Sequence, residues 1–419
     1  MTWTRRFFLQ SAGTSLLTLG LPSIQIWAEE PSPPLGKKKK IFVLVFLRGG
    51  MDGLNVIVPY QDPFYYKLRG FIALPRPDRS EGVLDLDGFF GLNPRLKTLF
   101  PYFQNGLATA INAVGYDLNS RSHFEEQNAW ETGATENALA SDGWLNRYLR
   151  LTKGKGPIRA VSIGESLPRV LQGKAPAYAL RSLADLSLGG SGEQNGIALD
   201  SLLNAYQDNV AGRIPSLLLE SNRSSLNGIH LLGDVLQKIS EPSVVYPENA
   251  FAQKLKEIAR LIKADVGLEV AEVDYDGWDT HQNQGAVQGQ FGTLVQTLSD
   301  AVATFMKDLE NQLDDILLLV CSEFGRTVAQ NGSNGTDHGW GNCMLAFGGP
   351  VLKAGKGKAR PVIGTWPGLA PEQLMQHRDL KHTTDFRDVF AEVLQTHLEV
   401  SEVDKILYQP HLAPVNLIA

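Results

Sequence analysis

Short, almost continuous apolar runs that end in glycine recur along this chain of 419 residues. The first, IFVLVFLRGG at 41–50, shows no alternation of polar and apolar residues. Such a run is typical of a strand buried on both faces, as in the middle of a parallel sheet. Five further runs have the same character and predict more strands of one sheet: 106–115, 158–164, 267–277, 316–325 and 343–349.

Segments with apolar residues at helical spacing lie between the later runs. The last of them begins with two threonines that are candidate caps, and Asp385 lies near its positive end. Strands alternating with helices predict an α/β fold, with a mostly parallel central sheet and helices on both faces. The segment 165–245, rich in Ser, Leu and Gly, predicts a helical insertion. The predicted helices are 248–265, 292–313 and 383–398.

The N-terminus has the pattern of an export signal. TRRFFLQ places Arg5 and Arg6 before an apolar segment that runs to Ala28. This predicts a twin-arginine signal at 1–28, cleaved near Ala28, and therefore a periplasmic or otherwise exported protein with the twin-arginine translocase as a partner. An uncleaved anchor is the alternative, although the apolar run is interrupted and too short for a comfortable membrane span. A Pro-rich, basic linker at 29–40 would then lead into a single domain at 41–419.

Composition excludes some classes of function. The net charge of −6 gives no basic face for nucleic acid. With 43% hydrophobic residues the chain can bury a large core. Its two cysteines, Cys321 and Cys343, lie in or beside apolar runs and predict buried thiols rather than a disulfide or a metal site.

Carboxylates and imidazoles follow or precede several of the predicted strands. In open α/β sheets, ligands bind beyond the carboxyl ends of the strands, so these side chains are expected to meet. Mixtures of carboxylate and imidazole suit divalent metals. An isolated Asp after a strand is more often a turn residue, and Glu323 could instead pair with Arg326, so the metal prediction rests on the joint pattern. The candidate ligands are Asp52, Asp279 (with Asp276 competing), His281, Glu323, Asp337 and His338.

The stretch NSRSHFEEQNAWETGA at 119–134 predicts the start of a helix. Ser122 is a natural cap there, and it is also well placed to be a nucleophile, because a helix N-terminus favours negative charge. His123 could be a ligand, a base or a residue without a role in chemistry. Arg121 could hold an anionic ester oxygen. Of the remaining histidines, His382 is held in reserve as a site residue.

These segments together resemble an exported bacterial family catalogued as domain of unknown function 1501. More distantly, by the order of motifs, they resemble the alkaline phosphatase/sulfatase superfamily. The resemblance implies an alkaline-phosphatase-like fold with Ser122 as the nucleophile. It implies Asp52 as the first ligand and Asp279 with His281 as the mid-chain pair. Glu323 would stand at the first position of an Asp-His-Gly segment, and His338 would be the late histidine.

Three departures from the superfamily pattern bear on the chemistry. Phe324 stands where the superfamily has a histidine ligand, so the resemblance implies that one metal site would be weak, absent or completed by Asp337. The spacing of Asp279 and His281 is closer than the usual Asp-x-x-x-His. No Cys-x-Pro-x-Arg motif is present, which favours phosphate over sulfate esters.

The expected function is an exported metal-dependent hydrolase of phosphate esters, or of related sulfate or phosphonate esters. One or two divalent ions (Zn, Mn, Mg or Ca) would activate Ser122 or a water and stabilise the leaving oxygen. Arg121 or Arg48 would bind the non-bridging oxygens of a small anionic ester. The alternative is a cell-envelope binding protein that has lost catalysis on the same fold, which Phe324 favours.

Overall fold

The computed structural model describes residues 40–134, 140–154, 156, 158–183, 239–354, 360–408 and 410–418. The predicted signal, most of the linker, and 184–238 of the predicted insertion lie outside these residues. Within the part of the chain described, no helix is long and apolar enough to cross a membrane.

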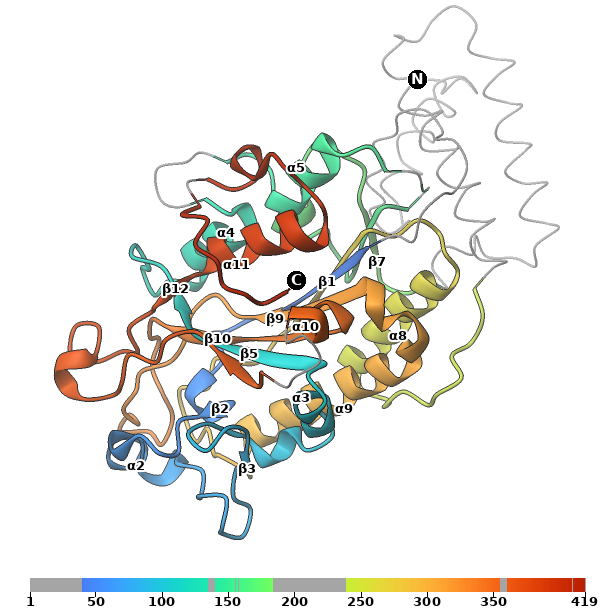
Figure 1. The fold of residues 1–419 in the computed structure, drawn as a ribbon. Helices are drawn as coiled ribbons and strands as arrows, with labels where there is room; N and C mark the ends of the chain where they lie inside the picture. Colours follow the sequence, from blue (N-terminus) through green and yellow to red (C-terminus); the bar gives the residue numbers. More distant parts are fainter. Residues whose placement is uncertain are drawn as a thin grey trace, which may run out of the picture.

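A mixed, mostly parallel sheet forms the centre of the molecule (Figure 1). In the described residues it has nine strands. Strand β1 (Ile41–Leu47) lies in the middle, with β8 (Val270–Tyr275) and β9 (Ile316–Cys321) as parallel neighbours. Beyond β8 follow β6 (Ala160–Ile163) and β7 (Tyr178–Leu180). The predicted α/β sheet is confirmed, and β7 shows that part of 165–245 belongs to it.

The other half of the sheet contains its one reversed strand among those described. Strand β10 (Asn342–Phe347) pairs antiparallel with β9 on one side and with β5 (Ala108–Gly115) on the other. The short strands β11 (Val362–Ile363) and β12 (Thr384–Asp385) run parallel to β5 along its far edge. Since β10 is reversed, the residues before it lie at the sheet edge where β1, β8 and β9 end.

Helices cover both faces of the sheet (Figure 1). Alternate residues of β1 enter two different cores. Val43 and Val45 pack on the side of α8 (Ala250–Lys263) and α9 (Gln290–Asp308). Phe42 and Leu44 pack on the side of α4 (His123–Thr132), α5 (Trp144–Leu151) and α11 (Phe386–Glu392). This double burial is why the β1 segment is apolar at every position.

Smaller elements complete the fold. A second sheet contains β2 (Ile57–Val58), β4 (Gly91–Leu92) and β3 (Leu84–Asp85). Helix α2 (Pro63–Arg69) precedes the strand β3, α3 (Phe100–Gln104) precedes β5, and α10 (Gly349–Ala354) follows β10. At α11 the cap is Asp385 rather than a threonine, and its carboxylate accepts a hydrogen bond from the backbone N–H of Arg387 at 2.8 Å.

Candidate metal centre

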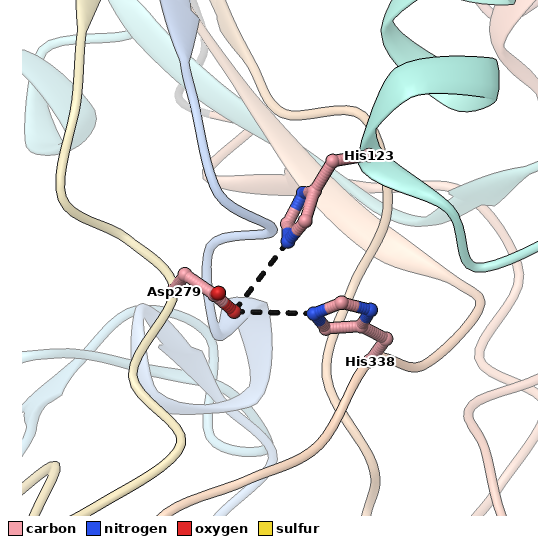
Figure 2. Close-up of side chains that lie close together, drawn as sticks. All are labelled: His123, Asp279 and His338. Carbon is pink, nitrogen blue, oxygen red and sulfur yellow. Dashed lines mark hydrogen bonds and ion pairs between the residues drawn. The ribbon is translucent and has the colours of Figure 1, made fainter.

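Segments that are far apart in the sequence meet at the carboxyl edge of the sheet. Asp279 and His281 lie in the loop after β8, and His338 lies in the loop that leads into β10. His123 is the first residue of α4, the helix that follows β5. Figure 2 shows the side chains of His123, Asp279 and His338 pointing toward one another from three different segments.

One carboxylate oxygen lies at the middle of this group. The Oδ1 atom of Asp279 is 3.0 Å from Nε2 of His281, 3.2 Å from Nε2 of His338 and 3.5 Å from Nε2 of His123. The Nε2 atoms of His281 and His338 are themselves 3.0 Å apart. All three imidazoles therefore direct the same ring nitrogen at one point.

The opposite ring nitrogen of each imidazole lies against an acceptor. A backbone carbonyl only accepts hydrogen bonds, and so does an ionised carboxylate. Each Nδ1 must therefore carry the proton, which leaves Nε2 of each neutral ring with a lone pair. The acceptors are the carbonyl oxygen of Arg121 for His338 (2.8 Å), Oδ1 of Asp337 for His281 (3.0 Å) and Oε1 of Glu323 for His123 (2.7 Å).

The two acceptor carboxylates are held in their ionised form. Burial alone would raise the pKa of Glu323, but hydrogen bonds from His123 and Gln127 outweigh it and the pKa is lowered. Burial would also raise the pKa of Asp337, but hydrogen bonds from Asn331 and His281 lower it. Both side chains therefore act as acceptors at neutral pH.

The cluster has the donor set of a metal site. Three lone pairs and a carboxylate oxygen at these distances repel one another unless a proton or a cation lies among them. The Nε2 atom of His123 is buried and has no hydrogen-bond partner among the described residues. Tetrahedral zinc with ligand bonds of about 2.0–2.1 Å separates its ligand atoms by about 3.3 Å. The distances from Oδ1 of Asp279 to the three nitrogens, and between Nε2 of His281 and Nε2 of His338, are close to this value. The ligand atoms of His123, Asp279 and His338 all lie within 4.8 Å of one another. Three imidazoles and one carboxylate fit zinc better than magnesium or calcium, which prefer oxygen ligands.

Comparison with known proteins places the chain in a family. A family model described as "Protein of unknown function (DUF1501)" matches residues 112–407, well over half of the chain. The chain belongs to the DUF1501 family. No curated protein matches it.

Solved structures similar to this DUF1501 chain are distant. The zinc-bound C-terminal periplasmic domain of EcEptC from Escherichia coli is 12% identical, over 76% of this chain and 75% of that one, with a TM-score of 0.36. A sulfatase from Pseudoalteromonas sp. is 13% identical over 91% and 70%, with a TM-score of 0.38. Alkaline phosphatase from the Antarctic bacterium TAB5 is 10% identical over 87% and 100%, with a TM-score of 0.34. Likenesses at this level assign no residue a role.

Arg326 fixes the position of Asp279 in the DUF1501 chain, a role that the sequence did not indicate. Its buried guanidinium donates to Oδ1 of Asp279 at 2.5 Å and to the carbonyl oxygens of Gly49 and Gly50. Burial alone would raise the pKa of Asp279, but the hydrogen bond and charge of Arg326 lower it. Arg326 therefore pairs with Asp279 and not with Glu323, the partner suggested by their closeness in sequence.

The glycine pair after β1 is required by close contacts. Gly49 has φ +120° and Gly50 has φ +67°, values that side chains with a Cβ rarely adopt. A Cβ on Gly49 would lie 2.6 Å from the backbone nitrogen of Asp279, and one on Gly50 would lie 2.4 Å from the ring of Phe324. The loop thus brings two carbonyls to Arg326 and packs closely against the backbone of Asp279 and the ring of Phe324.

Asp52 does not join the cluster, contrary to the prediction from the sequence. Both its oxygens accept hydrogen bonds from Arg69, at 2.6 and 2.8 Å, and Gln284 donates to one of them at 2.6 Å. Asp52 and Arg69 are fully buried. The turn after β1 directs this carboxylate into a buried ion pair, away from the three histidines.

Glu323 and Asp337 also differ from the prediction, because each contacts a histidine rather than the centre itself. Both oxygens of Glu323 are used, one by His123, Gln127 and the backbone of Gly49, the other by Ser322. Partners of this kind orient the imidazoles of metal sites and fix their tautomer. Of the competing carboxylates after β8, Asp279 reaches the histidines, and Asp276 is exposed.

Arg121 and Arg48 are already bound by carboxylates. Arg121 donates to Asp379 at 2.8 Å and to Gln376 at 2.8 Å. Arg48 donates to both oxygens of Glu131 and to Asp274. Neither guanidinium is free for the anion-binding role predicted from the sequence.

Ser122 and Phe324 border the histidines. Ser122 directly precedes His123 as the N-cap residue of α4, yet its hydroxyl makes no capping hydrogen bond. Phe324 is fully buried, and its ring lies 4.8 Å from that of His123 and 5.0 Å from that of His338, between ring centroids. His382, held in reserve, lies beside Asp117 instead, 3.5 Å away.

Proposed function

We propose that this DUF1501 chain is a metal-dependent hydrolase of phosphate or related anionic esters. The observation that carries the proposal is the convergence of three imidazole Nε2 atoms on one oxygen of Asp279. Each imidazole has an acceptor behind it that fixes its tautomer, as in metal sites of known function. A solvated cluster of charges would not require a hydrogen-bond acceptor at the Nδ1 atom of each imidazole.

His123, Asp279, His281 and His338 would hold the ion. A divalent cation there would stabilise negative charge that develops on an ester oxygen. The side chain of Asp279 is 46% exposed, so a substrate can reach the centre from solvent. Zinc is the ion that this donor set favours, and one ion is the number that it can hold.

Arg378 is the cation best placed for an anionic substrate. One of its Nη atoms donates to the carbonyl oxygen of His338 at 3.0 Å, and the other lies 3.5 Å from Asp379. The side chain is 42% exposed, in contrast to the nearly buried Arg48. Arg378 thus replaces Arg121 and Arg48 in our proposal as the residue that binds a non-bridging oxygen of the ester.

Ser122 remains the proposed nucleophile. It adjoins the ligand His123, and its hydroxyl is not engaged in capping α4. The N-terminus of this helix favours the negative charge of an attacking oxygen. The absence of a Cys-x-Pro-x-Arg motif from the sequence makes phosphate esters the better substrates than sulfate esters.

Turnover of p-nitrophenyl phosphate and p-nitrophenyl sulfate, before and after removal of metal, tests the proposal. We expect hydrolysis of the phosphate ester to stop after dialysis against a chelator and to return on addition of Zn²⁺. Hydrolysis unchanged in His338→Ala would contradict the proposed centre. A protein that binds zinc firmly but turns over neither ester would instead be a binding protein.

Export by the twin-arginine route is part of the same proposal, and it rests on Arg5 and Arg6 before an apolar segment. Replacing both by lysine should leave the folded protein in the cytoplasm. Equal export of both forms would contradict this route.

A further inference from the structure

Arg121 has an unusual backbone conformation at the rim of the metal centre. Its φ is +61°, in the left-handed region that disfavours any residue with a Cβ. In this conformation its carbonyl oxygen accepts the Nδ1–H of His338 at 2.8 Å. The backbone of Arg121 is therefore what fixes the tautomer of His338.

Interactions of the Arg121 side chain hold this backbone conformation in place. Its Nε donates to Oδ2 of Asp379 at 2.8 Å, and a terminal nitrogen lies 2.6 Å from the same oxygen. The guanidinium also donates to Gln376 and lies over the ring of Trp340, 5.0 Å from its centroid. Asp379 is fully buried, so this ion pair is poorly screened by solvent.

Asp379 contacts none of the proposed ligands through its side chain in the interactions that the structure gives. Its oxygen Oδ2 faces Arg121 and Arg378, and Oδ1 is buried without a hydrogen-bond partner in the part of the chain that the structure describes. A buried carboxylate with one unsatisfied oxygen lowers stability, so its presence indicates a role other than stabilisation. Asp379 binds the side chain of Arg121, and the backbone of Arg121 binds His338, which connects Asp379 to the metal centre.

We propose that Asp379 is a positioning residue of the metal centre. By binding the guanidinium of Arg121 it holds that backbone left-handed, and the Arg121 carbonyl then keeps the proton of His338 on Nδ1. Nε2 of His338 is thereby presented to the ion. This inference rests on the proposed metal centre and adds to it a residue that reaches the ligand only through Arg121.

Variants of Arg121 separate the backbone from the side chain. Glycine adopts a left-handed φ at no steric cost, whereas alanine does not. Arg121→Gly should therefore keep the carbonyl in place without the guanidinium, and Arg121→Ala should lose it. Zinc affinity, measured by competition with a chromophoric chelator, should fall more in Arg121→Ala than in Arg121→Gly.

Asp379→Asn should weaken zinc binding by about tenfold, the lower end of the effect of losing an outer partner of a metal ligand. In the Arg121→Gly background the same substitution should add no further loss. Asp385→Asn is the matched control. Asp385 is a buried aspartate whose two oxygens accept hydrogen bonds from Nε and Nη2 of Arg387, and Asp385 contacts no proposed ligand. It should leave zinc affinity unchanged.

A second readout does not depend on metal. Imidazole ¹⁵N–¹H correlation spectra of the metal-free protein should show the proton of His338 on Nδ1 in the wild type and a mixture of tautomers in Asp379→Asn. Equal zinc affinities in Arg121→Gly and Arg121→Ala, or an unchanged His338 tautomer in Asp379→Asn, would overturn the inference. If the wild type binds no zinc but the tautomer shifts, the positioning role stands and the metal proposal fails.

Discussion

At the scale of single residues, Asp52 distinguishes a structural carboxylate from a ligand. Asp52→Asn leaves the buried charge of Arg69 without its partner, so we expect the free energy of unfolding to fall by about 3–5 kcal/mol. Metal content should not change. Urea unfolding and elemental analysis of the same sample measure both, and Asp279→Asn is the comparison that should lose metal instead. A loss of metal in Asp52→Asn would restore it as a ligand.

Ser122 is the residue on which covalent catalysis depends in this account. Ser122→Ala removes the attacking oxygen but none of the proposed ligands. Metal content should stay at the wild-type level while turnover of the phosphate ester falls to background. Ser122→Thr keeps a hydroxyl and should retain part of the activity. Full activity in Ser122→Ala would show that water attacks directly.

Phe324 tests whether a second ion is held. Two of the carboxylates considered for a second site are used elsewhere, Asp52 by Arg69 and Glu323 by His123, Gln127 and Ser322. We therefore expect Phe324→His to keep one ion per chain, measured after exhaustive dialysis. Two firmly bound ions in this variant, or in the wild type, would point to a second site that these carboxylates complete after rearrangement.

Single residues also show which roles can be predicted from the sequence and which cannot. The sequence pointed to Asp279, His281 and His338, because these adjoin predicted strand ends and flexible glycines. The sequence also suggested Glu323 as a ligand, whereas in the structure Glu323 supports the ligand His123. Neighbouring side chains in one loop point in different directions, which a sequence pattern does not show. That choice depends on partners distant in sequence, such as Gln127, which no local pattern reveals.

At the scale of elements, the direction of β10 was the main unknown. An apolar run looks the same whichever way its strand runs, so the six predicted strands were found but the reversal of one was not. The reversal explains why Asp337 and His338 come before their strand while Asp279 and His281 follow theirs. Strand β7 and the short strands β11 and β12 lacked a signal because each is only two or three residues long.

Helix α4 is attached to the site through one face. Three residues spaced four apart lie on this face. His123 and Gln127 both contact Glu323, and Glu131 contacts Arg48. Glu131→Ala removes two hydrogen bonds to a charged group, so stability should fall by about 1.5–3 kcal/mol in urea unfolding. Zinc affinity should also fall, because α4 carries His123. Glu125→Ala, at an exposed position of the same helix, should change neither.

At the scale of the whole molecule, stability of the metal-free protein should depend on the pair of His123 and Glu323. The pKa of Glu323 is lowered from 4.5, so its contribution is present above that pH and is lost as the pH falls through the lower folded value. The hydrogen bond to Glu323 raises the pKa of His123 from 6.5, so its contribution is present below that pH and is lost as the pH rises through the folded value. The pair therefore stabilises most between the two.

Urea unfolding of metal-free wild type and Glu323→Gln over pH 3–9 measures this dependence. The difference between the two proteins should be largest near pH 5–6 and shrink on either side. A difference that does not vary with pH would mean that the carboxylate acts only through packing. Bound zinc should reverse the loss of stability at alkaline pH, because its ligands bind the ion in their deprotonated form.

The centre as a whole is assembled from three distant segments, and metal content tests it most directly. Elemental analysis of dialysed protein should find about one zinc ion per chain in the wild type, as one four-ligand site requires. His338→Ala should hold close to none while remaining folded. A wild type without bound metal after exposure to Zn²⁺, or a His338→Ala protein with as much metal as the wild type, would contradict the account.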